Sequence, residues 1–153
     1  MKKIHLKLAV IFPLLMVAAC SKDNETRGCL TYIPPAYADF NVVSSQTDED
    51  LFFSNTPTYK IKELYFFKIK DKLRKDTVRP DVVGAGAARY FKIELNNLVP
   101  SDTLVLKIAN NPDDSFIYTI KKTDEECPNY ILDKAFLNNK ELATDNGKLI
   151  LKK

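Results

Sequence analysis

Residues 91–120 read FKIELNNLVPSDTLVLKIANNPDDSFIYTI, and this stretch decides the fold class. Apolar and polar side chains alternate through three runs, and a turn-forming cluster of Asn, Asp, Ser and Pro separates each run from the next. The alternating apolar residues are Phe91, Ile93 and Leu95, then Leu104, Leu106 and Ile108, and finally Phe116, Tyr118 and Ile120. A period of two is that of a strand with one buried face. The stretch therefore predicts three strands of one meander.

Strand signals continue on both sides of this stretch. Residues 37–43 alternate in the same way, and residues 59–70 carry apolar side chains on both faces, which is typical of a strand in the middle of a sheet. Residues 130–137 fit a strand or a short helix, and the neighbouring strands favour a strand. Asn146-Gly147, before the apolar run 149–151, predicts a tight type I′ hairpin.

Turn signals recur about every 8–12 residues over the whole chain, as they do in sandwich folds. We therefore expect an all-β protein, an antiparallel β-sandwich of about 7–9 strands. Its type is expected to be immunoglobulin-like or transthyretin-like.

The first 19 residues have the layout of a secretory signal. A basic start with Lys2, Lys3 and Lys7 leads into the apolar run 8–17, and small residues follow before Cys20. An apolar run of about ten residues is too short for a hydrocarbon core of ~30 Å. A buried core helix is the alternative, but such a helix would show a period near 3.6, and this run is apolar all round.

The four residues Val17-Ala18-Ala19-Cys20 resemble a bacterial lipobox. The resemblance implies cleavage between Ala19 and Cys20, with Cys20 carrying two or three acyl chains such as palmitate, which hold a protein firmly on a membrane. The plainer alternative is an ordinary thiol beside an ordinary cleavage site. The predicted organisation is a signal peptide over residues 1–19, a lipidated, flexible acidic tether over 20–28, and one β-sandwich domain over 29–153.

The tether begins with Ser21-Lys22-Asp23-Asn24-Glu25, which is similar to the acidic export signal of surface lipoproteins of the Bacteroidota. The chain as a whole resembles the small β-sandwich lipoproteins of that phylum. This resemblance implies a lipid anchor in the outer membrane. It leaves open whether the domain is exposed on the cell surface or faces the periplasm.

Removing the signal changes the charge and the chemistry of the chain. Residues 1–19 contain three of the 23 basic residues, none of the 20 acidic ones, and the single histidine, His5. The remaining 134 of the 153 residues carry no formal net charge, so nucleic acid is not an expected partner. Without histidine, Ser-His-Asp and Cys-His catalysis and common zinc sites are excluded. We expect no catalytic residues, no metal site and no cofactor.

Two cysteines remain once Cys20 carries lipid. Cys29 and Cys127 form an even pair in an oxidising, exported compartment, so a disulfide between them is expected. Two separate buried thiols are the alternative, because the sequence shows no geometry.

Carboxylates are the main chemical groups left. Acidic clusters at residues 48–50, 113–114 and 124–126 each fall in a predicted turn, where they are typical of solvated turn residues. No EF-hand spacing supports Ca²⁺ binding. The tyrosines of the predicted strands are expected in core or half-buried positions. Asp76-Thr77-Val78 and Asp102-Thr103-Leu104 resemble the O-glycosylation acceptor pattern of the same phylum, although Thr103 falls inside a predicted strand.

These observations lead to two hypotheses. The first is a lipid-anchored, non-catalytic binding or assembly module that contacts the membrane through its lipid, and another envelope protein or a glycan through a sheet edge or loop cluster. The second is an accessory carboxylate-dependent glycan-processing enzyme. The second hypothesis requires two acids from different turns to converge in one cleft.

Overall fold

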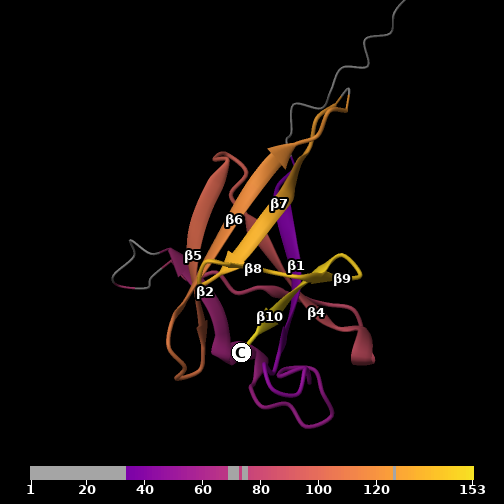
Figure 1. The fold of residues 1–153 in the computed structure, drawn as a ribbon, viewed down its shortest axis with the longest axis vertical. Helices are drawn as coiled ribbons and strands as arrows, with labels where there is room; N and C mark the ends of the chain where they lie inside the picture. The colour runs from indigo at the N-terminus through magenta and orange to yellow at the C-terminus, as the bar shows by residue number, and fades with distance from the viewer. Residues whose placement is uncertain (1–33, 69–72, 74–75, 126) are drawn as a thin grey trace, which may run out of the picture.

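The computed structural model describes residues 34–68, 73, 76–125 and 127–153, which form two facing five-stranded sheets. The first sheet has the order β3 (Asp81–Val83), β4 (Tyr90–Leu95), β1 (Ala36–Val43), β10 (Lys148–Lys152) and β9 (Thr144–Asp145). The second has the order β2 (Leu64–Lys68), β5 (Ser101–Ile108), β6 (Asp114–Lys122), β7 (Tyr130–Leu137) and β8 (Lys140–Glu141). The predicted all-β sandwich is confirmed (Figure 1).

The described strand pairs are antiparallel with one exception. β1 and β10 run parallel, with Phe40 opposite Leu149 and Val42 opposite Leu151. On its other side β1 pairs antiparallel with β4. The first and last long strands of the described chain therefore lie side by side in the middle of the first sheet.

The predicted meander over residues 91–120 is wrong at its first strand. β4 belongs to the first sheet, and the meander is formed instead by β5, β6 and β7. The alternating pattern is the same for a strand of either sheet, so the connection after the strand decides which sheet it joins. Here residues 96–100 carry the chain across to the other sheet, and the Asn96 N–H donates a hydrogen bond to the Tyr118 hydroxyl oxygen at 3.0 Å.

The prediction of a central strand over residues 59–70 also needs correction. A 3₁₀ turn, η2 (Ile61–Glu63), precedes β2, and the Lys60 N–H donates to the Glu63 carboxylate at 2.7 Å. β2 lies at the edge of the second sheet. β2 nevertheless has buried side chains on both faces, because Phe67, which alternation places on the outer face, is only 5% exposed. Residues 69 and 70 lie outside the described residues.

Aromatic rings fill the space between the sheets. Phe40 of β1 meets Phe66 of β2 edge-on, with ring centroids 5.8 Å apart, and stacks on Phe91 at 5.4 Å. The turn after β1 adds Phe52 and Phe53, whose rings lie 5.1 and 4.7 Å from Phe91. The core therefore continues beyond the strands to one end of the sandwich, where this turn closes it.

Two segments join the sheets at their sides, and we call them the 78–83 crossing and the 140–145 crossing. In the first, Val78 exchanges both backbone hydrogen bonds with Phe66 of the second sheet, and β3 then pairs with β4 of the first. Buried Pro80 stands between the two pairings. Because proline has no N–H, it is suited to the point where one ladder stops and the other starts.

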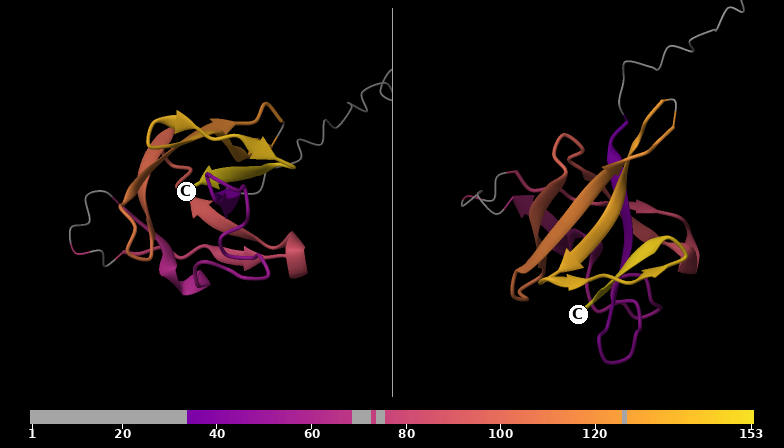
Figure 2. Two further views of the ribbon diagram at one scale, coloured as in Figure 1. Left: turned by 60° about the horizontal axis from the view of Figure 1, so that its bottom comes forward. Right: turned by 45° about the horizontal axis from the view of Figure 1, so that its top comes forward.

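The 140–145 crossing is made in the same way. β8 pairs with β7 in the second sheet, and the Leu142 N–H donates to the Ala135 carbonyl at 2.9 Å. One residue later, the Ala143 carbonyl accepts from the Ile150 N–H of β10 at 2.9 Å, and β9 continues this pairing in the first sheet. Figure 2 shows this segment, in yellow, running from one sheet to the other.

Tight turns flank the 140–145 crossing. The hairpin predicted at residues 145–148 is confirmed, since Asn146 and Gly147 have φ of 49° and 77°, the left-handed values that a type I′ turn requires. A second turn of this kind, at Asn138 and Asn139 with φ of 50° and 67°, was not predicted. Together the two turns let a short segment reverse twice and reach both sheets.

Candidate functional site

Most of the site residues that the sequence predicts lie outside the residues that the structure describes. Ala19, Cys20 and Cys29 fall in residues 1–33, so lipidation, cleavage and disulfide pairing stay predictions. Cys127 lies in the exposed turn between β6 and β7. Thr77 is exposed and precedes the pairing at Val78. Thr103 lies within β5 and is half-buried, so Thr77 is the more accessible of the two hydroxyls.

The acidic turn at residues 48–50 has a structural role. One carboxylate oxygen of Asp50 accepts hydrogen bonds from the N–H groups of Phe52 and Phe53, at 2.8 and 2.6 Å, and the other accepts from Asn41 at 3.0 Å. Exposed Asp48 pairs with Lys152 at 2.6 Å. These contacts hold the turn that brings its phenylalanines onto the core.

The second acidic turn holds the one buried charged residue among the described residues, Asp114. Its carboxylate accepts a hydrogen bond from the Asn138 amide at 2.8 Å and pairs with the Lys153 ammonium. The backbone N–H of Lys153 donates to the Val43 carbonyl, so the Asp114–Lys153 pair ties β6 to the end of β10 and to β1. Neighbouring Asp113 pairs with Lys107 at 2.8 Å.

The third acidic turn is exposed at Asp124 and Glu125, and residue 126 lies outside the described residues. None of the described acids of the three turns lines any of three pockets on the described part of the chain. The described acids of these turns are therefore not brought together in any of these three pockets.

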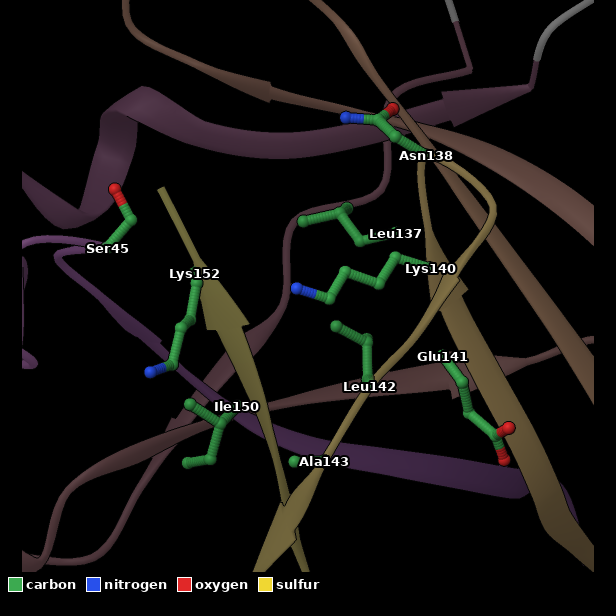
Figure 3. A pocket seen from close by; sticks show the side chains of 9 residues that line it. All are labelled: Ser45, Leu137, Asn138, Lys140, Glu141, Leu142, Ala143, Ile150 and Lys152. Atoms are coloured by element: carbon green, nitrogen blue, oxygen red, sulfur yellow. The ribbon is translucent and has the colours of Figure 1, made fainter.

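The largest of these pockets lies beside the 140–145 crossing, and we call it the lysine pocket. Its volume is about 620 Å³, within the range of small-molecule sites. Its lining residues are Ser45, Leu137, Asn138, Lys140, Glu141, Leu142, Ala143, Ile150 and Lys152 (Figure 3). The pocket thus combines an aliphatic wall with polar side chains at its margin.

The course of the backbone explains why this pocket exists. At Ala143 the crossing is hydrogen-bonded to Ile150 of β10, but residues 140–142 turn away to pair with β7. The two segments therefore meet at Ala143 and separate from there, as Figure 3 shows. The wedge between them is the pocket, and Leu137, Leu142 and Ile150 contribute its aliphatic wall.

The charges at the lysine pocket are unequal. The Lys140 side chain extends from β8 toward β10, whereas the Lys152 ammonium points away and pairs with Asp48 (Figure 3). The Glu141 carboxylate also points away and lies 3.4 Å from the Lys134 ammonium. No carboxylate in the described part of the chain pairs with Lys140. Lys140 is thus the cation that the pocket offers to a ligand.

A second pocket of about 480 Å³ shares Glu141 and Leu142 with the lysine pocket, and we call it the acidic pocket. It brings together three carboxylates from three strands, namely Asp39 of β1, Asp133 of β7 and Glu141 of β8. Each carboxylate already has a lysine within 4 Å, respectively Lys92, Lys121 and Lys134. Sequence reasoning missed this convergence because it looked for acids in turns and not in strands.

Tyr37 also lines the acidic pocket and corrects one expectation. Its side chain is 45% exposed and lies under the Lys92 ammonium, 5.0 Å from the ring centroid. The expected core position does hold for Tyr118, which is 1% exposed. The strand pattern puts Tyr37 on the face opposite Ala36 and Ala38, which are buried.

Sequence reasoning also missed the residues of the lysine pocket. Ser45, Lys140 and Lys152 come from three separate segments, and no short motif connects them. The available signal was Asn138-Asn139, because two successive residues that tolerate positive φ mark a tight turn. Reading that turn places Lys140 at the start of a new strand.

No protein-family model, curated protein or solved structure matches this chain. Within the described ranges, no three His, Cys, Asp or Glu side chains lie close enough together to hold a metal ion. In the same residues, no helix has the length and hydropathy needed to cross a bilayer.

Proposed function

We propose that this protein is a non-catalytic binding module that a lipid on Cys20 anchors in the outer membrane. The anchor is supported by the lipobox-like sequence Val17-Ala18-Ala19-Cys20 behind a basic and apolar leader. The binding role is supported by the lysine pocket, which joins an aliphatic wall to one available cation. That pocket is the observation that carries the proposal.

The anchor is tested by mass and by fractionation. The intact mass of the membrane form should equal that of residues 20–153 plus one diacylglycerol. One further acyl chain is added to this mass where the N-terminal amine is acylated. Cys20→Ala should release the chain from detergent-extractable membranes or leave it with its leader uncleaved. Recovery of a processed, membrane-bound Cys20→Ala protein would remove the anchor from the proposal.

A disulfide between Cys29 and Cys127 is part of the same proposal. Cys127 lies in the exposed turn between β6 and β7, and Cys29 is the other cysteine left in the sequence once Cys20 is lipidated. Such a bond would tie the start of the domain to the β6–β7 turn. Non-reducing peptide mapping should recover the two cysteines in one linked peptide, and alkylation of both in the native protein would exclude the bond.

Protease treatment of intact cells tests on which side of the outer membrane the domain lies. The acidic tether 21–25 supports surface exposure. Protease added to intact cells should then remove the domain, while a periplasmic control protein survives. Survival of the domain until the outer membrane is permeabilised would place it on the periplasmic face.

An accessory carboxylate-dependent glycan-processing enzyme is the second candidate, on strand acids in place of the turn acids, because Asp39, Asp133 and Glu141 line the acidic pocket. The lysine partner of each acid gives that acid a structural role as well. If the pocket were catalytic, Asp133→Asn would abolish reducing-end release from envelope glycans while leaving the fold intact. The binding-module proposal expects no such activity in the wild type.

A further inference from the structure

The wall of the lysine pocket is aliphatic. Leu137, Leu142, Ala143 and Ile150 form it, and no aromatic ring occurs among its nine lining residues. Leu137 is buried, and Leu142 packs against the main core. Contact with such a wall favours a flexible hydrocarbon chain, since burial of apolar surface is non-directional and follows the area removed from water.

The mouth of the pocket carries one available positive charge. Lys140 extends across the wedge toward β10, and the two other charged lining residues have partners elsewhere: Lys152 pairs with Asp48, and Glu141 with Lys134. Ser45 and Asn138 add neutral polar groups to the margin. A single ammonium between polar groups at the mouth and aliphatic groups inside matches a single anionic head on an apolar tail.

We propose that the lysine pocket binds a single-chain anionic amphiphile, with a carboxylate head at Lys140 and an alkyl chain along Leu137, Leu142 and Ile150. This inference names the ligand class of the binding module and so rests on the proposed function. A free fatty acid is the occupant that it commits to. The tail enters the wedge between β8 and β10, and the head stays at the solvent-facing end.

The test uses the full-length protein in isolated membranes and a dodecanoate with a diazirine near its methyl end. After illumination, adducts should map to residues 137–143 and 150–152. Excess dodecanoate should compete the labelling away, while dodecylamine, which has the same chain and the opposite charge, should not. Lysophosphatidylglycerol as a third competitor separates a fatty acid from an anionic lipid head group, because the inference expects it to compete at least tenfold less well.

Variants test the role assigned to each part of the pocket. Lys140→Glu should lower labelling at least tenfold, and Lys140→Met, which keeps the length of the side chain, should lower it severalfold. Lys122→Glu is the matched control, because Lys122 is an exposed lysine at the end of β6 outside the pocket, and its labelling should equal the wild type. Lys140 is exposed and has no carboxylate partner in the described residues, so its variants should fold.

The outcomes distinguish this inference from the proposed function. Equal labelling of wild type and Lys140→Glu, adducts spread over the surface, or equal competition by dodecylamine would overturn the amphiphile site. In each of these cases the Cys20 mass measurement would still decide the anchor. Specific labelling of a chain that carries no lipid on Cys20 would support the site and remove the anchor.

Discussion

The 78–83 and 140–145 crossings both join the two sheets, but their surroundings are packed differently. At the 78–83 crossing, Val78 pairs with Phe66, and the ring of Phe66 lies among Phe40 and Phe116, with centroids 5.8 and 5.6 Å away. At the 140–145 crossing the chain meets β10 at Ala143 and then leaves a wedge beside it. The 78–83 crossing thus pairs with a strand whose ring lies in the aromatic core, and we call it the closed crossing. The 140–145 crossing lies beside a pocket, and we call it the open crossing. The difference separates a part of the core that we expect to contribute most to stability from the pocket to which we assign binding.

The largest expected effect tests that division directly. Phe66→Ala should lower the free energy of unfolding by about 4 kcal/mol, since a fully buried ring leaves a cavity. Leu142→Ala, at the open crossing, should cost only about 1 kcal/mol because Leu142 is partly buried. Urea denaturation of the full-length protein measures both. Equal losses would mean that Leu142 is packed as tightly as Phe66 and would contradict the contrast between the two regions.

The next effect concerns two carboxylates that bind lining residues of the lysine pocket, Asp114 with Asn138 and Asp48 with Lys152. Asp114→Asn should cost roughly 3 kcal/mol, because it leaves the Lys153 ammonium, only 16% exposed, without its counter-charge. Asp48→Asn is the matched control, since Asp48 pairs with neighbouring Lys152 at an exposed site and its loss should cost about 0.5 kcal/mol or less. A large cost for the control would contradict the assignment of stability to the buried pair alone.

Glycines near the two crossings give a third comparison. Gly84, just after β3, has a φ of 87°, and an added Cβ would lie 2.6 Å from the Ala88 carbonyl oxygen. Gly147 has a φ of 77° with open space around it. Gly147→Ala should therefore cost about 1 kcal/mol from backbone strain, and Gly84→Ala roughly 2–3 kcal/mol from strain and overlap together. Thermal unfolding of both variants measures these costs, and a larger loss of stability in Gly147→Ala than in Gly84→Ala would contradict the predicted order.

The smallest effect concerns the hydrogen bond between the Asn96 N–H and the Tyr118 hydroxyl oxygen. Burial raises the pKa of Tyr118 above its ordinary value, and the nearby Asp102 carboxylate adds to the rise. The folded protein therefore keeps the phenol protonated at a pH where the unfolded chain loses the proton. The stability from Tyr118 is full below about pH 10 and is lost as the pH rises through the folded pKa.

Tyr118→Phe tests this linkage. At pH 7 it should cost about 1 kcal/mol, because the hydrogen bond from the Asn96 N–H is lost. Above pH 10 the variant should lose stability less steeply than the wild type, so the two curves should converge. Denaturant titrations at pH 7, 10 and 11 measure this, and parallel curves would show that Tyr118 does not contribute to the alkaline loss.

Local patterns in the sequence predict most of the strands but not which sheet they join. The alternation at residues 91–95 is correct for a strand, yet it places that strand in the wrong sheet, because one buried face looks the same in either sheet. Asn146-Gly147 predicts its hairpin correctly because the turn chemistry is local. The lysine pocket could not be predicted, since Ser45, Lys140 and Lys152 are brought together only by two turns and the parallel pairing of β1 with β10.

Native mass spectrometry of the full-length protein with dodecanoate tests the central claim most directly, namely that the open crossing is a binding site. The account predicts one dodecanoate per wild-type chain and none for Ala143→Trp, in which an indole at the exposed vertex fills the wedge. Val82→Trp, at an exposed position of the closed crossing, should bind like the wild type. Binding that survives Ala143→Trp, or that is lost in both variants alike, would contradict it.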